Sequence, residues 1–197
     1  MNILEKDPLQ LAQEWIDLAK EKSNMTYANA MSLATVNSAG EPSIRIVLLK
    51  ELNAQGFVFF TNYNSRKGRE IAANPHVAAN FYWDKTFRQL KVLGTIKKIS
   101  PADSQAYWQT RPRESQLSQY VSQQSQPVES REHLDELYNQ AEQELAGKEI
   151  ACPQHWGGYI ITPKEMEFWI GREHRFHDRF QFKITSSGEW LGQRLFP

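Results

Sequence analysis

Short apolar runs bounded by Asn, Gly or Pro recur through most of the chain, and such runs are typical of β-strands. The stretch 86–99 alternates most clearly, since Leu90 and Val92 fall on one face while Gln89 and Lys91 fall on the other. We expect the strands to follow one another in antiparallel order and to close into a barrel. The strands are predicted at residues 30–36, 43–50, 56–62, 76–83, 87–99, 156–163, 165–171, 175–184 and 189–196.

Helical patterns lie before and between these runs. Asp7 followed by Pro8 is typical of an N-cap and a first helical residue, and apolar positions then recur at helical spacing to about Lys22. Ser65 and Ser100 are the expected N-caps of two shorter helices. Beyond the first helix, helices are predicted at residues 65–75, 100–109 and 131–148.

The segment 111–130 is polar and carries no strand pattern, and its Gln- and Ser-rich part, 115–130, is the nearest thing to a flexible loop. Helical and polar segments therefore interrupt an otherwise strand-rich chain. We expect an α+β, mainly β fold that forms one domain over residues 1–197, with a helical insertion at about residues 100–148.

The charge balance argues against a protein that binds nucleic acid. Lys and Arg number 23, Asp and Glu also number 23, and the net charge is zero. A protein that binds nucleic acid through its bulk charge is normally basic, so any anion site here must be a local cluster. No apolar run approaches the length of a membrane span, so no membrane partner is expected.

The single cysteine, Cys152, excludes an internal disulfide and a metal site built from cysteines. A lone cysteine is typical of a reducing compartment. The first 22 residues are acidic and amphipathic, and they lack the apolar segment of a signal peptide. We therefore expect a cytoplasmic protein.

The stretch TNYNSRKGRE, residues 61–70, places two cations in the first turn of a helix capped by Ser65. Cations there oppose the helix dipole at a cost of about 0.3–1 kcal/mol each. Backbone N–H groups at a helix N-terminus already attract anions, so their combination with Arg66 and Lys67 favours a phosphate site. The alternative is an exposed, capped helix with solvated side chains.

Two further segments could bind anions. The strand 45–50, RIVLLK, carries a cation at each end, which suits either solvated strand ends or a backbone that runs along a flat ligand. Tyr107, Arg111 and Ser115 follow at spacings of four, but Pro112 disfavours a continuous helix through them. Arginine binds phosphate through two parallel hydrogen bonds, and hydroxyls add donors. A solvated helix end is the alternative for this segment.

The stretch EFWIGREHRFHDRF, residues 167–180, is predicted to place Arg175, His177 and Arg179 on one strand face. Together with Trp169 they combine a stacking ring, two permanent charges and a group that titrates near neutral pH. This set suits an aromatic anion bound beside a redox-active ring. A solvated cationic surface is the alternative.

Other common site types find little support. His174 and His177 form an HxxH pair, but the sequence places no third ligand, so no metal is expected. The chain has no Walker loop, no dinucleotide-binding GxGxxG motif and no GxSxG nucleophile motif. A flavin, if one binds, is therefore not held in the manner of a Rossmann fold.

Several long motifs resemble the pyridoxamine 5′-phosphate oxidase family and occur in its order: RIVLLK, FFTNYNSRKGRE, RQLKVLG, YWQTRPRESQLSQYVSQQS, WGGY and EFWIGREHRFHDRF. The resemblance runs from about residue 8 to Pro197. It implies an FMN-binding split β-barrel that acts as a homodimer, with two FMN molecules at the interface, each contacted by both chains. It also implies oxidation of pyridoxine or pyridoxamine 5′-phosphate to pyridoxal 5′-phosphate, with O2 as acceptor, H2O2 as product and NH3 released from the amine.

The resemblance also implies roles for individual residues. The implied FMN contacts are Arg45, Ile46, Val47, Leu48, Leu49, Lys50, Phe60, Thr61, Arg66, Lys67, Gln89, Gln124, Ser125, Trp169 and Arg179. The implied contacts to the substrate are Lys50, Tyr107, Arg111, Ser115, Arg175, Phe176 and His177. Arg175 and His177 are the implied catalytic residues, which orient the substrate so that its C4′ hydrogen faces flavin N5 for hydride transfer.

Two features depart from the family pattern. Many members carry an N-terminal arm that closes over the site, whereas the first helix here is expected from Pro8, and Ile170 stands where many members have Gln. Lys50 favours a vitamin B6 substrate over the related phenazine-pathway branch. The alternatives are a flavin oxidase of the same fold that acts on another aromatic substrate, and a non-catalytic protein that binds FMN or pyridoxal phosphate.

Overall fold

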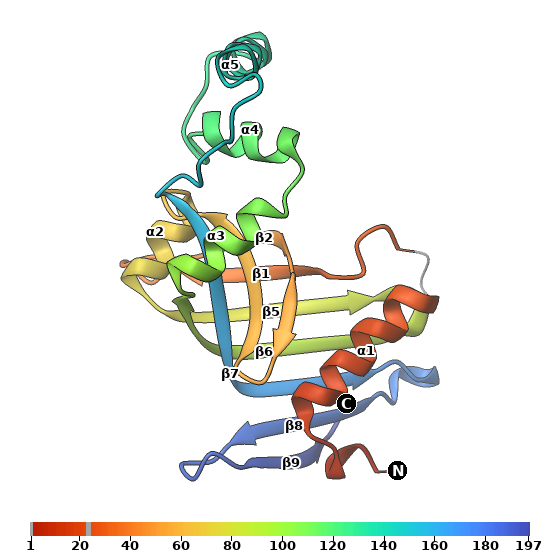
Figure 1. Ribbon diagram of the computed structural model, residues 1–197. Helices are drawn as coiled ribbons and strands as arrows, with labels where there is room; N and C mark the ends of the chain where they lie inside the picture. Colours follow the sequence, from red (N-terminus) through yellow and green to blue (C-terminus); the bar gives the residue numbers. More distant parts are fainter. Residues whose placement is uncertain (1, 23–24) are drawn as a thin grey trace.

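The structure is a computed structural model that describes residues 2–22 and 25–197. Within these residues nine strands form an antiparallel sheet that curls into an open, split barrel (Figure 1), in the order β2-β1-β5-β6-β7-β4-β3, with β8 and β9 continuing from β7. The strands are β1 (Ala30–Val36), β2 (Pro42–Leu48), β3 (Glu51–Asn53), β4 (Gly56–Asn62), β5 (His76–Trp83), β6 (Arg88–Lys98), β7 (Trp156–Ile170), β8 (Asp178–Ile184) and β9 (Trp190–Leu195).

Strand β7 joins the two parts of the sheet. On one side it pairs with β6, while on the other its first half pairs with β4 and its second half with β8. The change of partner lies near Pro163, where the register of the β6–β7 pair shifts opposite Leu93 and Gly94 and leaves Lys164 of β7 unpaired. The prediction of two strands at 156–163 and 165–171 was wrong, because a bulge bends a strand and accommodates a proline without ending the ladder.

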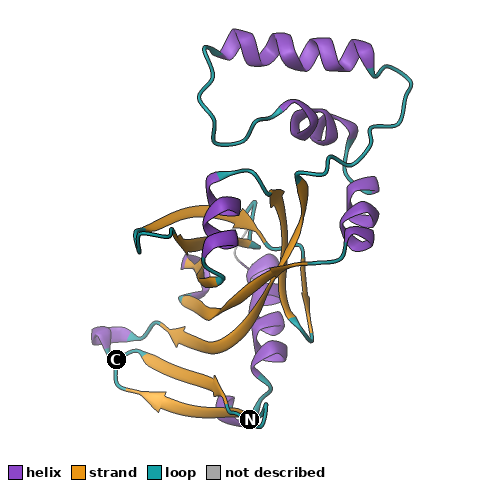
Figure 2. Ribbon diagram, turned by 90° about the vertical axis from the view of Figure 1, so that its left-hand side faces the viewer, coloured by secondary structure: helices purple, strands orange, loops and turns teal. Residues whose placement is uncertain are grey.

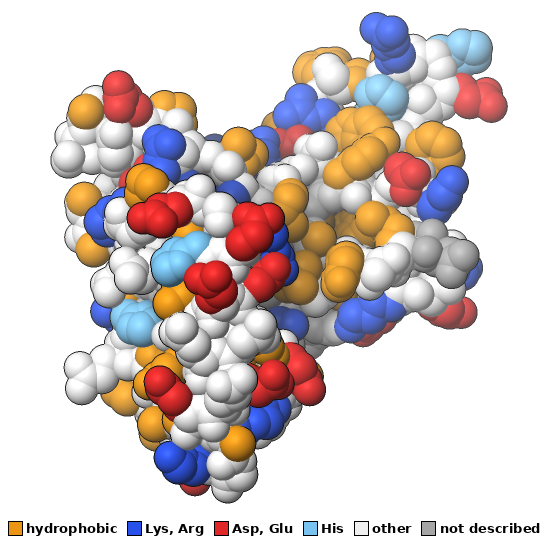
Figure 3. All heavy atoms as spheres, turned by 90° about the horizontal axis from the view of Figure 1, so that it is seen from above, with side chains coloured by type: hydrophobic (Ala, Val, Ile, Leu, Met, Phe, Trp, Pro, Cys, Tyr) orange, Lys and Arg blue, Asp and Glu red, His pale blue; other side chains and the backbone are white. Residues whose placement is uncertain are grey.

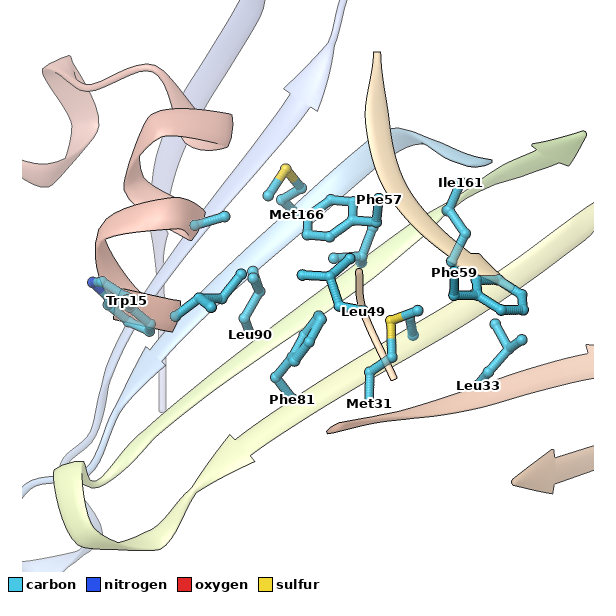
Figure 4. Close-up of a cluster of buried hydrophobic side chains, with 14 of the residues drawn as sticks. Trp15, Met31, Leu33, Leu49, Phe57, Phe59, Phe81, Leu90, Ile161 and Met166 are labelled. Carbon is cyan, nitrogen blue, oxygen red and sulfur yellow. The ribbon is translucent and has the colours of Figure 1, made fainter. Parts of the chain in front are cut away.

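The main core lies between the sheet and helix α1 (Pro8–Lys22), which crosses it (Figures 1 and 4). As predicted, Asp7 caps this helix, since its carboxylate accepts the Gln10 N–H at 2.9 Å. The Trp15 ring meets Phe168 edge to face at 5.0 Å. Burying each such large apolar side chain contributes about 1.5–3 kcal/mol. The strand residues around them include Met31, Leu33, Phe57, Phe59, Phe81, Leu90, Ile161 and Met166.

Three helices stand together at one end of the barrel, between β6 and β7 in the sequence (Figure 2). They are α3 (Pro101–Gln109), α4 (Arg113–Val121) and α5 (Arg131–Glu144). A second, smaller core lies among them, and the indole N–H of Trp108 donates to the Ile150 carbonyl at 2.7 Å inside it. The buried members of this core are Trp108, Leu117, Ala141, Ile150 and Trp156.

Helix α4 corrects the expectation of a flexible loop at 115–130. Leu117 is the one buried residue of this helix and packs into the second core. Arg113 donates to the carbonyls of Leu145 and Lys148, which ties the start of α4 to the end of the α5 region. The helix was missed because a single buried position leaves no apolar period for sequence analysis to detect.

Helix α2 (Arg66–Ala73) begins as predicted, with the Ser65 hydroxyl accepting the Gly68 N–H at 3.3 Å. Short 3-10 turns complete the chain, and they are η1 (Ile3–Glu5), η2 (Asp84–Thr86) and η3 (Glu173–Arg175). None of the helices in the described part of the chain is long and apolar enough to cross a membrane. Acidic and basic side chains are interspersed on the face seen in Figure 3, rather than gathered by sign.

We expect Gly68→Ala to destabilise the protein, although helix propensity alone favours alanine by about 1 kcal/mol. A Cβ at Gly68 would lie 2.0 Å from the Tyr63 carbonyl oxygen, so the first turn of α2 must shift. Overpacking of this kind typically costs about 1–3 kcal/mol. The measurement is the free energy of unfolding by chemical denaturation, with the exposed Ala72→Gly as the propensity control. A more stable Gly68→Ala protein would contradict the close contact.

Candidate active site

The first group of expected site residues gathers at the N-terminus of α2. The Lys67 ammonium donates to Thr61 Oγ1 and Gln124 Oε1, each at 3.0 Å, and to Ser65 Oγ at 3.2 Å. Burial, and after it repulsion by Arg45, lowers the pKa of Lys67 from 10.5 to about 8. A bound anion favours the charged ammonium, so this cluster is chemically suited to a phosphate.

A buried carboxylate, Glu70, lies beside this cluster and was not among the predicted site residues. One of its oxygens accepts hydrogen bonds from Thr35, Ser43 and Arg45, and the other accepts the Arg66 Nε–H at 2.8 Å. Burial alone would raise the pKa of Glu70, but these four hydrogen bonds lower it to about 2. The i, i+4 spacing from Arg66 was the sequence signal that could have indicated this contact.

The expected contact strand, residues 45–50, lies at the edge of the sheet, because β2 pairs with β1 alone among the described strands. Val47 and Leu49 are buried on its inner face, as the alternation predicts, while Ile46 is 61% exposed. Lys50 is exposed just beyond the end of β2. The outer face of this edge strand is therefore open to a ligand or to another chain.

Next to this strand, Phe60, Tyr107 and Trp156 form a stack that we call the aromatic shelf. The ring centroids of Phe60 and Tyr107 lie 3.8 Å apart, and those of Phe60 and Trp156 lie 5.4 Å apart. The guanidinium of Arg111 lies over the Trp156 ring at 5.0 Å. A cavity of about 650 Å³ is lined by Lys50, Phe60 and Tyr107. Aromatic walls with nearby cations suit a flat, anionic ligand.

The structure brings Tyr107, Arg111 and Ser115 into one region although Pro112 interrupts the helix between them. Arg111 Nη2 donates to the Ser115 carbonyl at 3.2 Å, while its buried Nε has no hydrogen-bond partner among the described residues. Burial lowers the pKa of Arg111. An unpaired buried donor costs free energy, which an anionic ligand with an acceptor oxygen would recover.

The second group of expected residues lies near the far end of β7. Gln89 and Arg179 are the cross-strand neighbours of Trp169 on its two sides. Arg179 Nε donates to Glu167 Oε1 at 2.8 Å, and Lys91 donates to the other oxygen of Glu167 at 2.6 Å. Glu167 is buried and holds Arg179 in place through this hydrogen bond. The sequence analysis did not identify this role.

The prediction that Arg175, His177 and Arg179 share one strand face was wrong. Strand β8 begins only at Asp178, and residues 173–175 form a 3-10 turn that contains two consecutive positive φ angles, 56° and 60°. Left-handed backbone of this kind breaks the alternation of a strand. Arg175 and His177 therefore lie on a tight turn that precedes the strand carrying Arg179.

The His177 ring has a defined orientation on this turn. Its Nδ1 accepts the Arg172 N–H at 3.1 Å, and its centroid lies 4.6 Å from that of Trp169. Because Nδ1 is an acceptor, the proton of the neutral ring lies on Nε2. His177 thus presents an N–H donor away from the backbone, beside Phe176, which is 77% exposed.

Within one chain the two groups remain separate. β7 carries Trp156 of the aromatic shelf at its first residue and Trp169 next to its last. Ser125, another expected contact, follows Gln124 with a positive φ of 74° and belongs to the first group. In residues 2–22 and 25–197, no three His, Cys, Asp or Glu side chains are arranged to hold a metal ion.

Comparisons with known proteins identify the family. The family description "Pyridoxamine 5′-phosphate oxidase" matches residues 19–139, and "Pyridoxine 5′-phosphate oxidase C-terminal dimerisation region" matches residues 156–197. The second match indicates a homodimer. A pyridoxine/pyridoxamine 5′-phosphate oxidase of Leptospira biflexa is 48% identical over 97% of this chain and 89% of its own length. One of Pseudomonas fluorescens is 44% identical with the same coverage.

Solved structures agree on the fold. PhzG from Burkholderia lata, in complex with tetrahydrophenazine-1-carboxylic acid, superposes with a TM-score of 0.90 at 26% identity and covers 97% of this chain and 93% of its own. An FMN-binding protein from Nostoc punctiforme related to pyridoxamine 5′-phosphate oxidase superposes with a TM-score of 0.81 at 18% identity, covering 98% and 100%. The chain therefore belongs to the pyridoxamine 5′-phosphate oxidase family of FMN-dependent oxidoreductases.

Proposed function

We propose that this protein oxidises pyridoxine 5′-phosphate or pyridoxamine 5′-phosphate to pyridoxal 5′-phosphate, with O2 as the acceptor. The reaction releases H2O2, and NH3 when the amine is the substrate. The observation that carries the proposal is the pocket lined by Lys50, Phe60 and Tyr107. Arg111 lies over the neighbouring Trp156 ring, and its buried Nε lacks a partner among the described residues. The names of the relatives at 44–48% identity support the same substrates.

The residues present fit FMN. The capped N-terminus of α2 offers backbone N–H groups, Arg66 and Lys67 to a phosphate, and the depressed pKa of Lys67 indicates a cation that gains from an anionic neighbour. The exposed face of the strand 45–50 offers a flat backbone edge to the ring system. FMN, when bound, accepts a hydride from the substrate and passes the electrons to O2.

The separation of the two groups along β7 supports a site shared by two chains. We propose that the first group of one protomer faces the second group of its partner, and that each FMN lies between them. The match of residues 156–197 to a dimerisation region supports this arrangement, because that region carries Trp169, Arg179 and the turn at 173–177. On this proposal the described monomer holds two half-sites rather than one complete site.

The protein's own residues then have distinct tasks. Lys50, Tyr107, Arg111 and Ser115 bind the substrate phosphate, and charge-assisted bonds from the two cations hold it strongly. Arg175, Phe176 and His177 of the partner subunit's turn cover the substrate ring and orient C4′ toward the flavin. His177 donates from Nε2 to a polar substituent, while the permanent charge of Arg175 stabilises negative charge on the substrate oxygen. Such positioning supplies much of the rate.

One observation favours a second candidate. The superposition on PhzG, at 26% identity, suits a flavin oxidase that acts on another aromatic acid. The higher identity to the pyridoxine/pyridoxamine 5′-phosphate oxidases, at 48%, favours the vitamin B6 substrates. A non-catalytic FMN carrier would not need the ordered turn that holds His177.

We expect the purified protein, supplied with FMN in air, to form pyridoxal 5′-phosphate from at least one of the two substrates. H2O2 should appear in equal amount, because each substrate oxidation reduces one O2. The measurement follows aldehyde absorbance and peroxide together, and a phosphate-free pyridoxine control should react poorly since Lys50 and Arg111 then bind nothing. FMN-loaded protein that oxidises neither phosphate ester would contradict the proposal.

We expect Arg175→Ala and His177→Ala each to retain FMN and to lose turnover by about 10²-fold or more, because they act on the substrate rather than on the cofactor. The measurement compares kcat/KM with the flavin content of the purified variants. His174→Asn is the matched control, since asparagine tolerates the left-handed backbone there. Loss of FMN from either alanine variant would reject the assigned roles.

We expect FMN affinity to fall as pH rises above about 8, where Lys67 loses its proton in the free protein. Binding then requires uptake of that proton, so the dissociation constant should approach a tenfold rise per pH unit. The unfolded lysine titrates near 10.5, so the free protein is stabilised, not weakened, as pH rises from about 8 to 10.5. Fluorescence titration with FMN measures the dissociation constant at each pH, and Lys67→Arg should flatten its pH dependence. An equal pH dependence for riboflavin would contradict it.

A further inference from the structure

We infer that Glu70 is a positioning residue that orients Arg66 for the FMN phosphate. The inference rests on the proposed function, because it takes FMN as the ligand of α2. Glu70 does not itself contact the phosphate. Its negative charge alone would repel that anion. Three features of the contacts around Glu70 lead to this role.

The first feature is the way in which Glu70 contacts Arg66. Glu70 Oε1 accepts the Nε–H of Arg66 at 2.8 Å, one helical turn along α2. The Arg66 side chain remains 59% exposed, and no hydrogen bond from its two terminal nitrogens is found in the described residues. A guanidinium held at Nε presents its terminal N–H groups as a fixed fork, which matches two phosphate oxygens.

The second feature is that Glu70 is itself immobile. Its side chain is 6% exposed, and its other oxygen accepts bonds from Thr35 of β1 and from Ser43 and Arg45 of β2. Two strands, and its own helix through Arg66, therefore fix the carboxylate before any ligand arrives. A group held this firmly can hold an exposed arginine in one orientation, which lowers the entropic cost of binding.

The third feature is the state of Arg45. Its guanidinium donates to the Leu33 carbonyl at 3.1 Å, and also to Thr35, Ser43 and Glu70. These bonds engage both of its terminal nitrogens inside the protein. Arg45 thus serves as the counter-ion of Glu70, and Arg66 is the arginine of the pair that is free to meet a phosphate.

The charges around Glu70 are consistent with Arg45 as its counter-ion and Arg66 as the phosphate ligand. Glu70 stays ionised across the neutral range, and the charges that face it are Arg45 from β2 and Arg66 from its own helix. Two cations against one carboxylate leave a net positive charge, to which Lys67 adds. The carboxylate can therefore orient Arg66 without making the site repulsive to an anion.

A double-mutant cycle on FMN binding tests the inference. Dissociation constants are measured for FMN and for riboflavin with the apoprotein, its Glu70→Gln and Arg66→Ala variants, and the double variant. We expect Glu70→Gln to weaken FMN binding about fivefold to tenfold, the cost of leaving one long side chain unordered. Riboflavin, which lacks the phosphate, should bind as before. In the Arg66→Ala background the added effect of Glu70→Gln should be less than about twofold, because the residue acts through Arg66.

Two further variants keep the test decisive if Glu70→Gln folds poorly. Ser43→Ala removes one donor to Glu70 at a partly exposed position and should weaken FMN, not riboflavin, by a smaller factor. Glu165→Gln is the matched control, because Glu165 is also paired with a cation, Lys183, but lies on β7 away from α2. It should leave the ratio of FMN to riboflavin affinity unchanged.

Each other outcome overturns the inference. Equal loss of FMN and riboflavin affinity would mean that Glu70 only maintains the fold. An undiminished effect in the Arg66→Ala background would mean that it acts through another group. Tighter or unchanged FMN binding by Glu70→Gln would mean that orientation contributes nothing. Failure of the unmodified apoprotein to bind FMN would instead reject the proposed function on which the inference rests.

Discussion

The arrangement of the molecule depends on the continuous hydrogen bonding of β7. This strand pairs with β6 throughout, yet exchanges β4 for β8 on its other side, so it must bend without breaking. Gly94 permits the bend, because a Cβ there would lie 2.2 Å from the Thr162 carbonyl oxygen. The same continuity keeps the shelf at Trp156 apart from the second group at Trp169, and the proposed two-chain site rests on this separation.

Two buried carboxylates, one on α2 and one near the end of β7, add rigidity to the candidate site. Glu70 receives Arg45 and Arg66, and Glu167 receives Lys91 and Arg179. Burying a charge is costly, and removing one partner of such a pair leaves the other uncompensated. In return, the arginine side chains are held in a fixed orientation before a ligand binds. Cofactor sites that begin in this state lose less entropy on binding.

Much of the fold could be predicted from the sequence, since most strands and helices carry clear alternation, periodicity or caps. Ser65 predicted the start of α2 correctly, and the apolar run before Asn62 predicted β4. Tertiary contacts decided the rest. Helix α4 depends on Leu117 finding a core built by distant segments, and the turn before β8 depends on left-handed backbone that the alternating residues concealed.

The candidate site shows the same division between local and distant effects. The expected site residues lie within short, continuous motifs, so the order of these motifs in the sequence was enough to indicate them. Glu167 escaped attention because its partners lie on other strands, and Glu70 because all of its partners except Arg66 lie on β1 and β2. The half-site arrangement was implied by the family resemblance, while the position of Trp156 and Trp169 on β7 gives it a physical basis.

The placement of two half-sites on one chain has a genetic consequence. Under the proposed two-chain site, a copy defective in the α2 group and a copy defective in the 173–177 turn each form inactive homodimers. A mixed dimer of the two carries both defects in one of its sites and neither in the other. Two alleles that are null when alone can therefore complement each other within a single cell.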